Sequence, residues 1–245
     1  MIATSEQDIN GLKEVGRIVR LALDESEKMV KAGVTTLAID KRVGEILAQH
    51  GARSAPMLAY NFPGFSCISV DDEAAHGIPS DRVLKEGQLV NIDVSAEKDG
   101  YWADSGRSIP VGTVKEHLLN LCLTTKKALD AGIKAARAGS PINSIGKAVE
   151  AVAVKGGFQI IEGLVGHGVG RHIHEPPEVH NKYKANGREI LQEGLVITIE
   201  PFLTKGKGFY REGRDGWTLL TLDGSPSAQY EHTLIITKDQ PIIVT

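Results

Sequence analysis

Apolar side chains recur at helical spacing in two consecutive segments at the start of the chain. In residues 5–31 the recurring positions are Ile9, Leu12, Ile18, Val19 and Ala22, and the pattern ends near Gly33. In residues 36–49 they are Leu37, Val43, Ile46 and Leu47, with Thr35 or Thr36 as the candidate N-cap and Gly51 as the stop. Apolar residues three or four positions apart are typical of amphipathic helices, so two helices are predicted.

From Ser54 to Ser69 the chain becomes rich in Pro, Gly and aromatic residues and contains APMLAYNFPGFSC. These residues interrupt regular structure. A short strand is predicted over Cys67 to Val70, and the segment that follows, DDEAAHGIPSD, is predicted to be a loop.

The next segment alternates between apolar and polar residues. Val90, Ile92 and Val94 alternate with Asn91, Asp93 and Ser95, which predicts a half-buried strand. Asp99-Gly100 signals a turn, and a four-residue loop over 97–100 would place Asp93 opposite Asp104. Two carboxylates that meet across a strand pair repel each other and favour a cation between them. A surface hairpin with two solvated acids, or a different loop register, is the alternative.

The same order of elements recurs in the second half of the chain. A helix is predicted from about Glu116 to Ala136, a second helix within AGSPINSIGKAVEAVAVKGG, and strands over Leu195 to Glu200 and Tyr230 to Thr237. Ile39 and Val43 recur as Ile145 and Val149 at one constant offset, and Ile92 and Asp93 recur as Ile199 and Glu200 at an offset one residue longer. Amphipathic helices can resemble each other by chance, but a chance match does not extend across helix and strand. The recurrence predicts one α+β domain over residues 1–245, with pseudo-twofold halves of about 1–110 and 111–245.

The duplication gives the second half its own pair of acids. Glu231 should stand to Glu200 as Asp104 stands to Asp93, although a longer excursion, Thr204 to Gly224, separates the second pair and contains Trp217. Four converging carboxylates cannot all be ionised without cations. Oxygen-rich ligation completed by one imidazole suits divalent Mn, Fe, Co or Zn, and two ions that share carboxylates form the usual hydrolytic arrangement.

The imidazole predicted to complete this set is His167, within GLVGHGVGRHIHEPP, where several glycines let the backbone approach closely. This stretch lacks the order of a phosphate-binding loop. His76 and His174 lie in Pro/Gly loops of the two halves, where they would line a site above the sheets. The remaining histidines are interpreted as surface or structural groups: His50, His117, His172, His180 and His232.

Composition narrows the classes of function without choosing among them. The chain has 245 residues, of which 41% are hydrophobic and 24% charged, and its net charge of −3 gives no reason to expect nucleic-acid or membrane binding. Two cysteines are too few for a disulfide framework, and no apolar run is long enough to span a membrane. The polar beginning has no apolar leader, so a cytoplasmic location is expected.

Taken together, these motifs resemble the type I methionine aminopeptidases, whose fold is called pita-bread. The resemblance is carried by AHGIP, VNIDVSAEKDGYWADSG, GHGVG followed by HEPP, ITIEP, and GWT with QYEHT. It implies two divalent metal ions per chain, drawn from Co, Mn, Fe or Zn. It also implies five metal ligands, of which Asp104 and Glu231 bridge the two ions: Asp93, Asp104, His167, Glu200 and Glu231.

The resemblance also implies an activity, the removal of the N-terminal methionine of nascent proteins that have a small second residue. Glu200 would shuttle the proton, His174 would donate to the developing oxyanion, and His76 would bind the peptide nitrogen or the next residue's backbone. Candidates for the methionine pocket are Phe62, Cys67, Ile173 and Trp217, and ordinary core packing is the alternative for these four residues.

Some features depart from the family pattern or remain open. Asp71 and Ala75 stand where many members have Asn and Cys, so a monovalent-ion or thiol role there is not expected to carry over. The basic excursion residues are candidates for a transient ribosome contact, with a solvated loop as the alternative: Lys205, Lys207, Arg211 and Arg214. A monomer is expected. Two other functions are weighed, a prolidase-like enzyme, which usually carries an additional N-terminal domain, and a non-catalytic pita-bread protein, which would typically have lost ligands.

Overall fold

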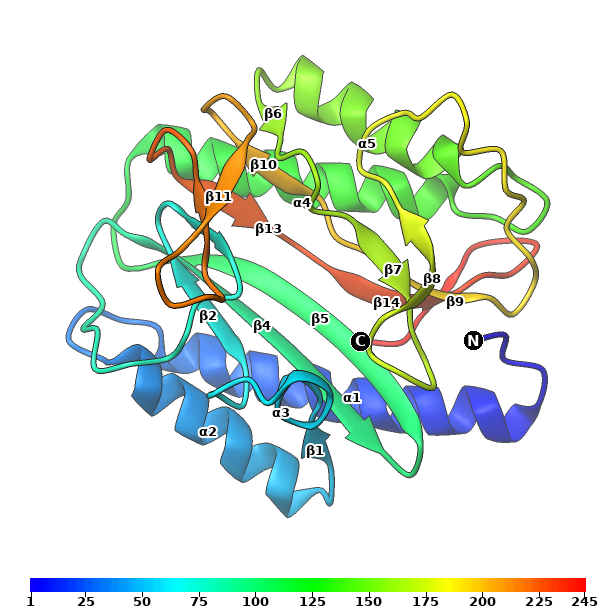
Figure 1. Ribbon diagram of the computed structural model, residues 1–245, viewed down its shortest axis with the longest axis horizontal. Coiled ribbons are helices and arrows are strands. Elements are labelled where there is room, and N and C mark those ends of the chain that lie inside the picture. Colours follow the sequence, from blue (N-terminus) through cyan, green and yellow to red (C-terminus); the bar gives the residue numbers. More distant parts are fainter.

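Two pairs of long helices enclose a central set of strands in the computed structural model, which describes all residues 1–245 (Figure 1). α1 and α2 lie on one side of the long β4–β5 hairpin, and α4 and α5 lie on the other side of the molecule. The helices are α1 (Glu6–Met29), α2 (Thr36–Gln49), α3 (Ala55–Tyr60), α4 (Glu116–Ala135) and α5 (Asn143–Lys155). The four long helices agree with the predicted ranges to within a few residues, and none of the five combines the length and apolarity needed to cross a bilayer.

Short polar side chains fix where the first two helices begin. The Ser5 hydroxyl accepts from the Asp8 amide at 3.1 Å, and the Asp8 carboxylate accepts from the Ser5 amide at 3.2 Å, which together form a capping box. Thr35, rather than Thr36, is the N-cap of α2, since its hydroxyl accepts from the Ala38 amide at 3.1 Å. Thr36 instead donates to the Ser80 carbonyl.

Two short elements occur where loops were predicted. α3 lies in the Pro-rich run, where Pro56 occupies a first-turn position, and it ends at Asn61, whose left-handed φ of 56° stops the helix. β3 (Glu73–Ala75) lies within DDEAAHGIPSD and pairs with β12 (Leu219–Thr221) of the excursion. A strand whose partner lies so far along the chain leaves no local signal, because its pairing depends on the tertiary fold.

The first-half sheet has the order β1 (Arg53–Ser54), β4 (Leu89–Lys98), β2 (Cys67–Val70), and β5 (Tyr101–Pro110) also pairs with β4. The predicted hairpin register is wrong by two residues. Lys98 pairs with Tyr101, so the turn is only Asp99-Gly100, and Asp104 faces Ser95 while Asp93 faces Gly106. Asp99 and Gly100 both have positive φ, at 51° and 81°, as a type I′ turn requires.

Because side chains alternate with a period of two, a two-residue shift leaves Asp93 and Asp104 on the same face of the hairpin. The expectation of a half-buried strand is also wrong. Asn91, Ser95 and Glu97, on the polar face of β4, are 5–7% exposed. Gln229 of the second half contacts Asn91, whereas Arg53 of β1 contacts Glu97.

The second half builds its equivalent of the hairpin from interrupted strands. β9 (Val196–Ile199) pairs with β14 (His232–Ile235), and β10 (Phe202–Thr204) pairs with β13 (Ser227–Gln229). Glu200 therefore follows the end of β9 and Glu231 precedes the start of β14. Four strands extend these pairs: β6 (Gln159–Ile160), β7 (Gly166–Gly168), β8 (Glu175–Val179) and β15 (Ile242–Ile243). β11 (Tyr210–Glu212) belongs to a separate sheet, where it pairs with β12.

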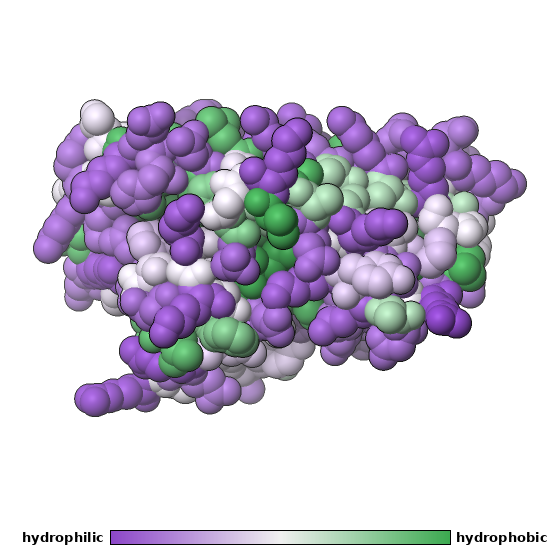
Figure 2. Space-filling view, turned by 90° about the horizontal axis from the view of Figure 1, so that it is seen from above, coloured by the Kyte–Doolittle hydropathy of each residue, from purple (hydrophilic) through white to green (hydrophobic).

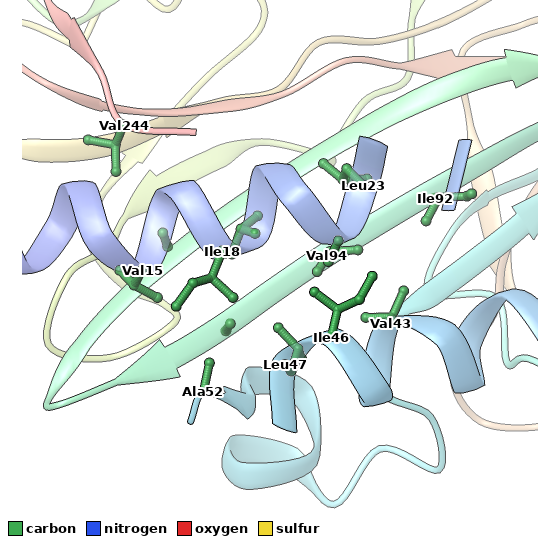
Figure 3. Packing of buried hydrophobic residues seen from close by; sticks show 14 of the residues in the cluster. Val15, Ile18, Leu23, Val43, Ile46, Leu47, Ala52, Ile92, Val94 and Val244 are labelled. Carbon is green, nitrogen blue, oxygen red and sulfur yellow. The ribbon is translucent and has the colours of Figure 1, made fainter. Parts of the chain in front are cut away.

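Each half has its own hydrophobic core. In the first, Val15, Ile18 and Leu23 of α1 and Ile46 of α2 pack on β4 (Figure 3). A second cluster joins α4 and α5 to the strands of the second half, with Leu129, Ile145, Val149 and Ile199 among its fully or almost fully buried members. The predicted α+β organisation in two halves is confirmed.

The halves meet where β5 approaches the segment between β13 and β14. Arg107 forms a β-bridge with Tyr230, and the Glu231 amide donates to the Gly106 carbonyl at 2.9 Å. The face seen from above, on the side of α4 and α5, is mostly hydrophilic, with apolar residues in small groups (Figure 2). Polar side chains also lie in the interior, where Asn91 and Gln229 are buried at the junction of the two halves.

Candidate metal centre

The structure brings the five predicted ligands together at the junction of the two halves. Ligand atoms of Asp104, His167 and Glu231 lie within 4.8 Å of one another. His167 Nε2 lies 3.4 Å from Glu200 Oε1 and 3.9 Å from Asp104 Oδ2. Asp93 lines the same cavity, where burial and then the charges of Asp104 and Glu200 raise its pKa. Three strands and two strand breaks, drawn from both halves, thus supply one cluster.

Two carboxylate oxygens in this cluster have no hydrogen-bond partner. They are Asp104 Oδ1 and Glu231 Oε1, on residues that are 7% and 2% exposed. Buried polar atoms are nearly always paired, so such orphans need an explanation. A cation between them would satisfy both. Four carboxylates and one imidazole are donors that suit a divalent metal. The two oxygens without a hydrogen-bond partner are also explained if a cation binds there.

Burial and mutual repulsion raise the pKa values of the carboxyl groups in the cluster. Burial raises the pKa of Asp104 to about 6. Burial, reinforced by the charge of Asp104, raises the pKa of Asp93, Glu200 and Glu231 well above their usual values. Burial and the nearby His174 lower the pKa of His167 to about 3, so its imidazole is neutral and has a free lone pair at neutral pH.

A further layer of polar groups, which sequence reasoning missed, orients the cluster. The His167 Nδ1–H donates to the Gly168 carbonyl at 2.9 Å, which leaves Nε2 facing the acids. Thr198 Oγ1 donates to Glu200 Oε1 at 2.9 Å, and Gln229 Nε2 donates to Glu231 Oε2 at 2.9 Å. Each lies two residues before the acid that it contacts, so strand periodicity is the signal that could have found them.

The glycines around His167 allow the close backbone packing that the sequence predicts. A Cβ on Gly166 would lie 2.5 Å from the Thr198 carbonyl oxygen, and one on Gly168 would lie 2.2 Å from that of Pro176. Gly163 and Gly170 instead adopt positive φ, at 87° and 130°.

Replacing Gly168 with Ala is expected to lower the free energy of unfolding by about 1–3 kcal/mol, because backbone must move to admit the methyl group. Urea unfolding measures this. Gly187→Ala is the matched control, since its nearest contact would be 3.2 Å from the Asn143 Cβ. Equal stability of the two variants would contradict the packing argument.

The cluster opens into a cavity of about 690 Å³. Asp93, Asp104, His167 and Glu200 line it, and the buried Glu231 lies beside it. All four candidates for the methionine pocket line it too: Phe62, Cys67, Ile173 and Trp217. The Phe62 and Trp217 rings meet edge to face at 5.2 Å between centroids. Phe62 and Ile173 are 3% and 4% exposed, so they belong both to the core and to the cavity wall.

Both loop histidines reach the cavity, one from each half. His76, with a left-handed φ of 56°, and His174 line the wall, and the His174 ring packs edge to face against His167 at 4.3 Å between centroids. The five histidines interpreted as structural are absent from the wall. Tyr60 and Pro56 of α3 also line the cavity, and both were missed because the sequence did not predict α3.

The two departures from the family pattern have local roles in the structure. The Asp71 carboxylate accepts from the Leu89 amide at 2.9 Å and from Gln88 Nε2 at 2.7 Å. Ala75 is 5% exposed, belongs to β3 and contributes to the cavity wall. Asp71 therefore ties the start of β4 to the turn after β2.

The raised pKa values predict that the metal-free protein loses stability as pH rises. A carboxyl group whose folded-state pKa exceeds its unfolded value binds more protons when folded, so its stabilising contribution disappears as pH rises through the folded pKa. His167 and His232 have lowered folded pKa values and act in the opposite sense, but only below about pH 6.5. Above that pH the acid cluster determines how the free energy of unfolding changes with pH.

We therefore expect urea unfolding of chelated protein to give a free energy of unfolding that falls between about pH 6.5 and 8.5. A divalent metal should flatten this dependence, because the cation replaces the protons. A stability of the chelated protein that rises over this range would contradict the prediction.

Comparison with known proteins identifies the family. Residues 10–238 match the model of metallopeptidase family M24. The chain belongs to metallopeptidase family M24. It is 45% identical to methionine aminopeptidase 2 of Bacillus subtilis, with 100% of this chain and 99% of the relative covered. It is 42% identical to a methionine aminopeptidase of Staphylococcus epidermidis, with 100% and 98% covered. The resemblance seen in the motifs is thus confirmed.

Solved M24 structures confirm the fold. A methionine aminopeptidase from Thermotoga maritima superposes with a TM-score of 0.97 at 32% identity, with 100% of this chain and 99% of that chain covered. The prolidase from Pyrococcus furiosus gives a TM-score of 0.80 at 22% identity, and this chain covers 65% of it. This M24 chain therefore has the pita-bread fold, which the prolidase shares.

Proposed function

We propose that this chain is a methionyl aminopeptidase that removes the N-terminal methionine from nascent polypeptides with a small second residue. The observation that carries the proposal is the convergence of four acids and His167, with two orphan carboxylate oxygens, at the wall of a cavity of about 690 Å³. Relatives that are 42–45% identical over the whole chain and are named methionine aminopeptidases support the choice of substrate.

The same five residues would hold two divalent metal ions, with Asp104 and Glu231 shared between them. Each of these two acids has one buried oxygen without a hydrogen-bond partner, which supports its assignment as a shared ligand. When bound, the ions would polarise the carbonyl of the first peptide bond and lower the pKa of the attacking water.

Glu200 would take the proton of that water and pass it to the leaving nitrogen. Its carboxylate lines the cavity and is held by the Thr198 hydroxyl at 2.9 Å.

The loop histidines would act as hydrogen-bond donors to the substrate. His174 would stabilise negative charge on the carbonyl oxygen, and His76 would bind the peptide nitrogen or the backbone of the second residue. Their positions in separate loops, one from each half, let them approach a bound peptide from two directions.

The thioether side chain of methionine would enter the apolar part of the cavity between Phe62, Ile173 and Trp217, with Cys67 at its base. Cys67 pairs across the sheet with Asp93, so this pocket adjoins the metal centre. Burial, with the charge of Asp93, raises the pKa of the Cys67 thiol well above its usual value, so the side chain stays neutral and suits an apolar substrate group.

Hydrolysis of a Met-Ala-Ser peptide tests the proposal. Chelated protein should be inactive, and Co or Mn should restore release of methionine. Met-Leu-Ser should react at least about tenfold more slowly, since one misfitting apolar side chain costs on the order of 1–3 kcal/mol. Preferential cleavage of an Xaa-Pro peptide would instead indicate prolidase activity. Calorimetry that detects no divalent-ion binding would indicate a non-catalytic protein.

Several finer expectations remain predictions within this proposal. They are a single catalytic domain, a monomeric state, a cytoplasmic location, and the use of Co, Mn, Fe or Zn. A transient ribosome contact would use the basic excursion. Of its side chains, Arg211 and Arg214 form no ion pair within the chain, whereas the Lys205 ammonium donates to the Gly157 carbonyl at 3.1 Å.

A further inference from the structure

A hydrogen bond at the wall of the cavity joins the two halves of the chain. The hydroxyl of Tyr60, at the end of α3, contacts Nδ1 of His174, in the loop between β7 and β8. The two rings lie 5.5 Å apart between centroids and are tilted by 38°. We propose that Tyr60 is a positioning residue that fixes His174 as the tautomer with its proton on Nε2.

The hydrogen-bonding capacity of the two groups supports this tautomer. A neutral imidazole has one donor and one acceptor nitrogen, and the partner of one nitrogen decides which is which. Nδ1 of His174 is the only group in the chain that the Tyr60 hydroxyl contacts, and we assign the hydroxyl as donor and Nδ1 as acceptor. The proton of His174 then resides on Nε2, which has no partner in the chain and belongs to a ring that lines the cavity.

The surroundings of both rings restrict their movement. The His174 ring packs edge to face on His167, at 4.3 Å between centroids. Tyr60 is held by the short helix α3, which is capped by Ser54 and ended by the left-handed Asn61. The next residue, Phe62, is 3% exposed and packs on Trp217. Tyr60 is itself 44% exposed, so its hydroxyl can be removed without disturbing the core.

This inference rests on the proposed function and makes it more specific. A carbonyl oxygen that gains negative charge needs a hydrogen-bond donor directed at it. While Nδ1 accepts from Tyr60, His174 can donate to the substrate only from Nε2–H. Without Tyr60, the proton would be shared between the two nitrogens, and part of the population would present an acceptor to the substrate. The contribution of Tyr60 should therefore appear in kcat rather than in KM.

The test compares Tyr60→Phe with the wild-type protein. Long-range 1H–15N correlation spectra of protein labelled at histidine nitrogen, metal-free and zinc-loaded, report the tautomer of His174 without any need for activity. Turnover of Met-Ala-Ser reports kcat and KM. Tyr183→Phe is the matched control, because Tyr183 is 50% exposed and its hydroxyl makes no hydrogen bond.

We expect Nε2–H for His174 in the wild-type and Tyr183→Phe proteins, and a mixed pattern in Tyr60→Phe. We also expect kcat to fall about 3- to 10-fold in Tyr60→Phe, with KM changed less than about twofold, as the loss of one hydrogen bond predicts. An Nδ1–H pattern in the wild-type protein, or an unchanged pattern in Tyr60→Phe, would overturn the inference. Absence of peptidase activity from all three proteins would contradict the proposed function and leave the tautomer measurement standing.

Discussion

Replacing Glu200 with Gln is expected to lower kcat for Met-Ala-Ser by about 10²- to 10⁴-fold, the usual contribution of a positioned acid–base group. Gln keeps the size of the side chain and its contact with the Thr198 hydroxyl, but it cannot take up a proton. Steady-state kinetics at saturating metal measure the effect, and calorimetry on the same sample establishes that the variant binds the ion.

The control for this change is Glu193→Gln, which alters an exposed acid paired with Lys238 far from the cavity. Its kinetics should match the wild type. Near-normal turnover by metal-loaded Glu200→Gln would rule out the proposed shuttle. A variant that has lost the ion would not measure the shuttle, which is why ion binding is determined first.

Replacing Asp104 with Asn is expected to change metal affinity and metal-free stability in opposite directions. The Kd for Co or Mn should rise by more than the 10- to 100-fold that is typical for loss of an outer-shell partner, because the change removes a proposed direct ligand. The free energy of unfolding of the chelated protein should increase by about 1–3 kcal/mol, since Asn relieves the repulsion of Asp93, Glu200 and Glu231 and can donate to one of them.

Isothermal titration and urea unfolding in chelator, both at pH 8, measure these two effects. Asp99→Asn is the control, because it removes the same charge at the hairpin turn, where the side chain is 81% exposed. A chelated Asp104→Asn protein that is less stable than the wild type would show that Asp104 has a structural role independent of any cation.

Much of this architecture could be predicted from the sequence because its signals are local. The caps and apolar periodicity of α1 and α2 lie within their own segments. The placement of Asp93 and Asp104 on one face depends only on the parity of the hairpin register, so it survived an error of two residues in the loop. Parity cannot distinguish a two-residue loop from a four-residue loop. The loop has two residues because Asp99 adopts the positive φ that a type I′ turn requires.

The features that were missed depend on contacts between distant segments. β3 forms because β12 pairs with it, and α3 is too short for a periodic signal. Asn91 donates to Gln229 at 2.8 Å across the junction of the halves, and Gln229 in turn donates to Glu231. No spacing within either half contains that information. The Tyr60–His174 contact was missed for the same reason.

The β-bridge between Arg107 and Tyr230 and the hydrogen bond from the Glu231 amide to the Gly106 carbonyl bear on how such a chain could be divided. A fragment of residues 1–110 would keep two of the acids but would expose the polar inner surface of β4 to water, and the complementary fragment would lack the β5 edge that holds Glu231 in place. Neither piece alone contains all five proposed metal ligands. Association of the two fragments into a folded complex should therefore depend on added divalent ions, which would bind acids from both fragments.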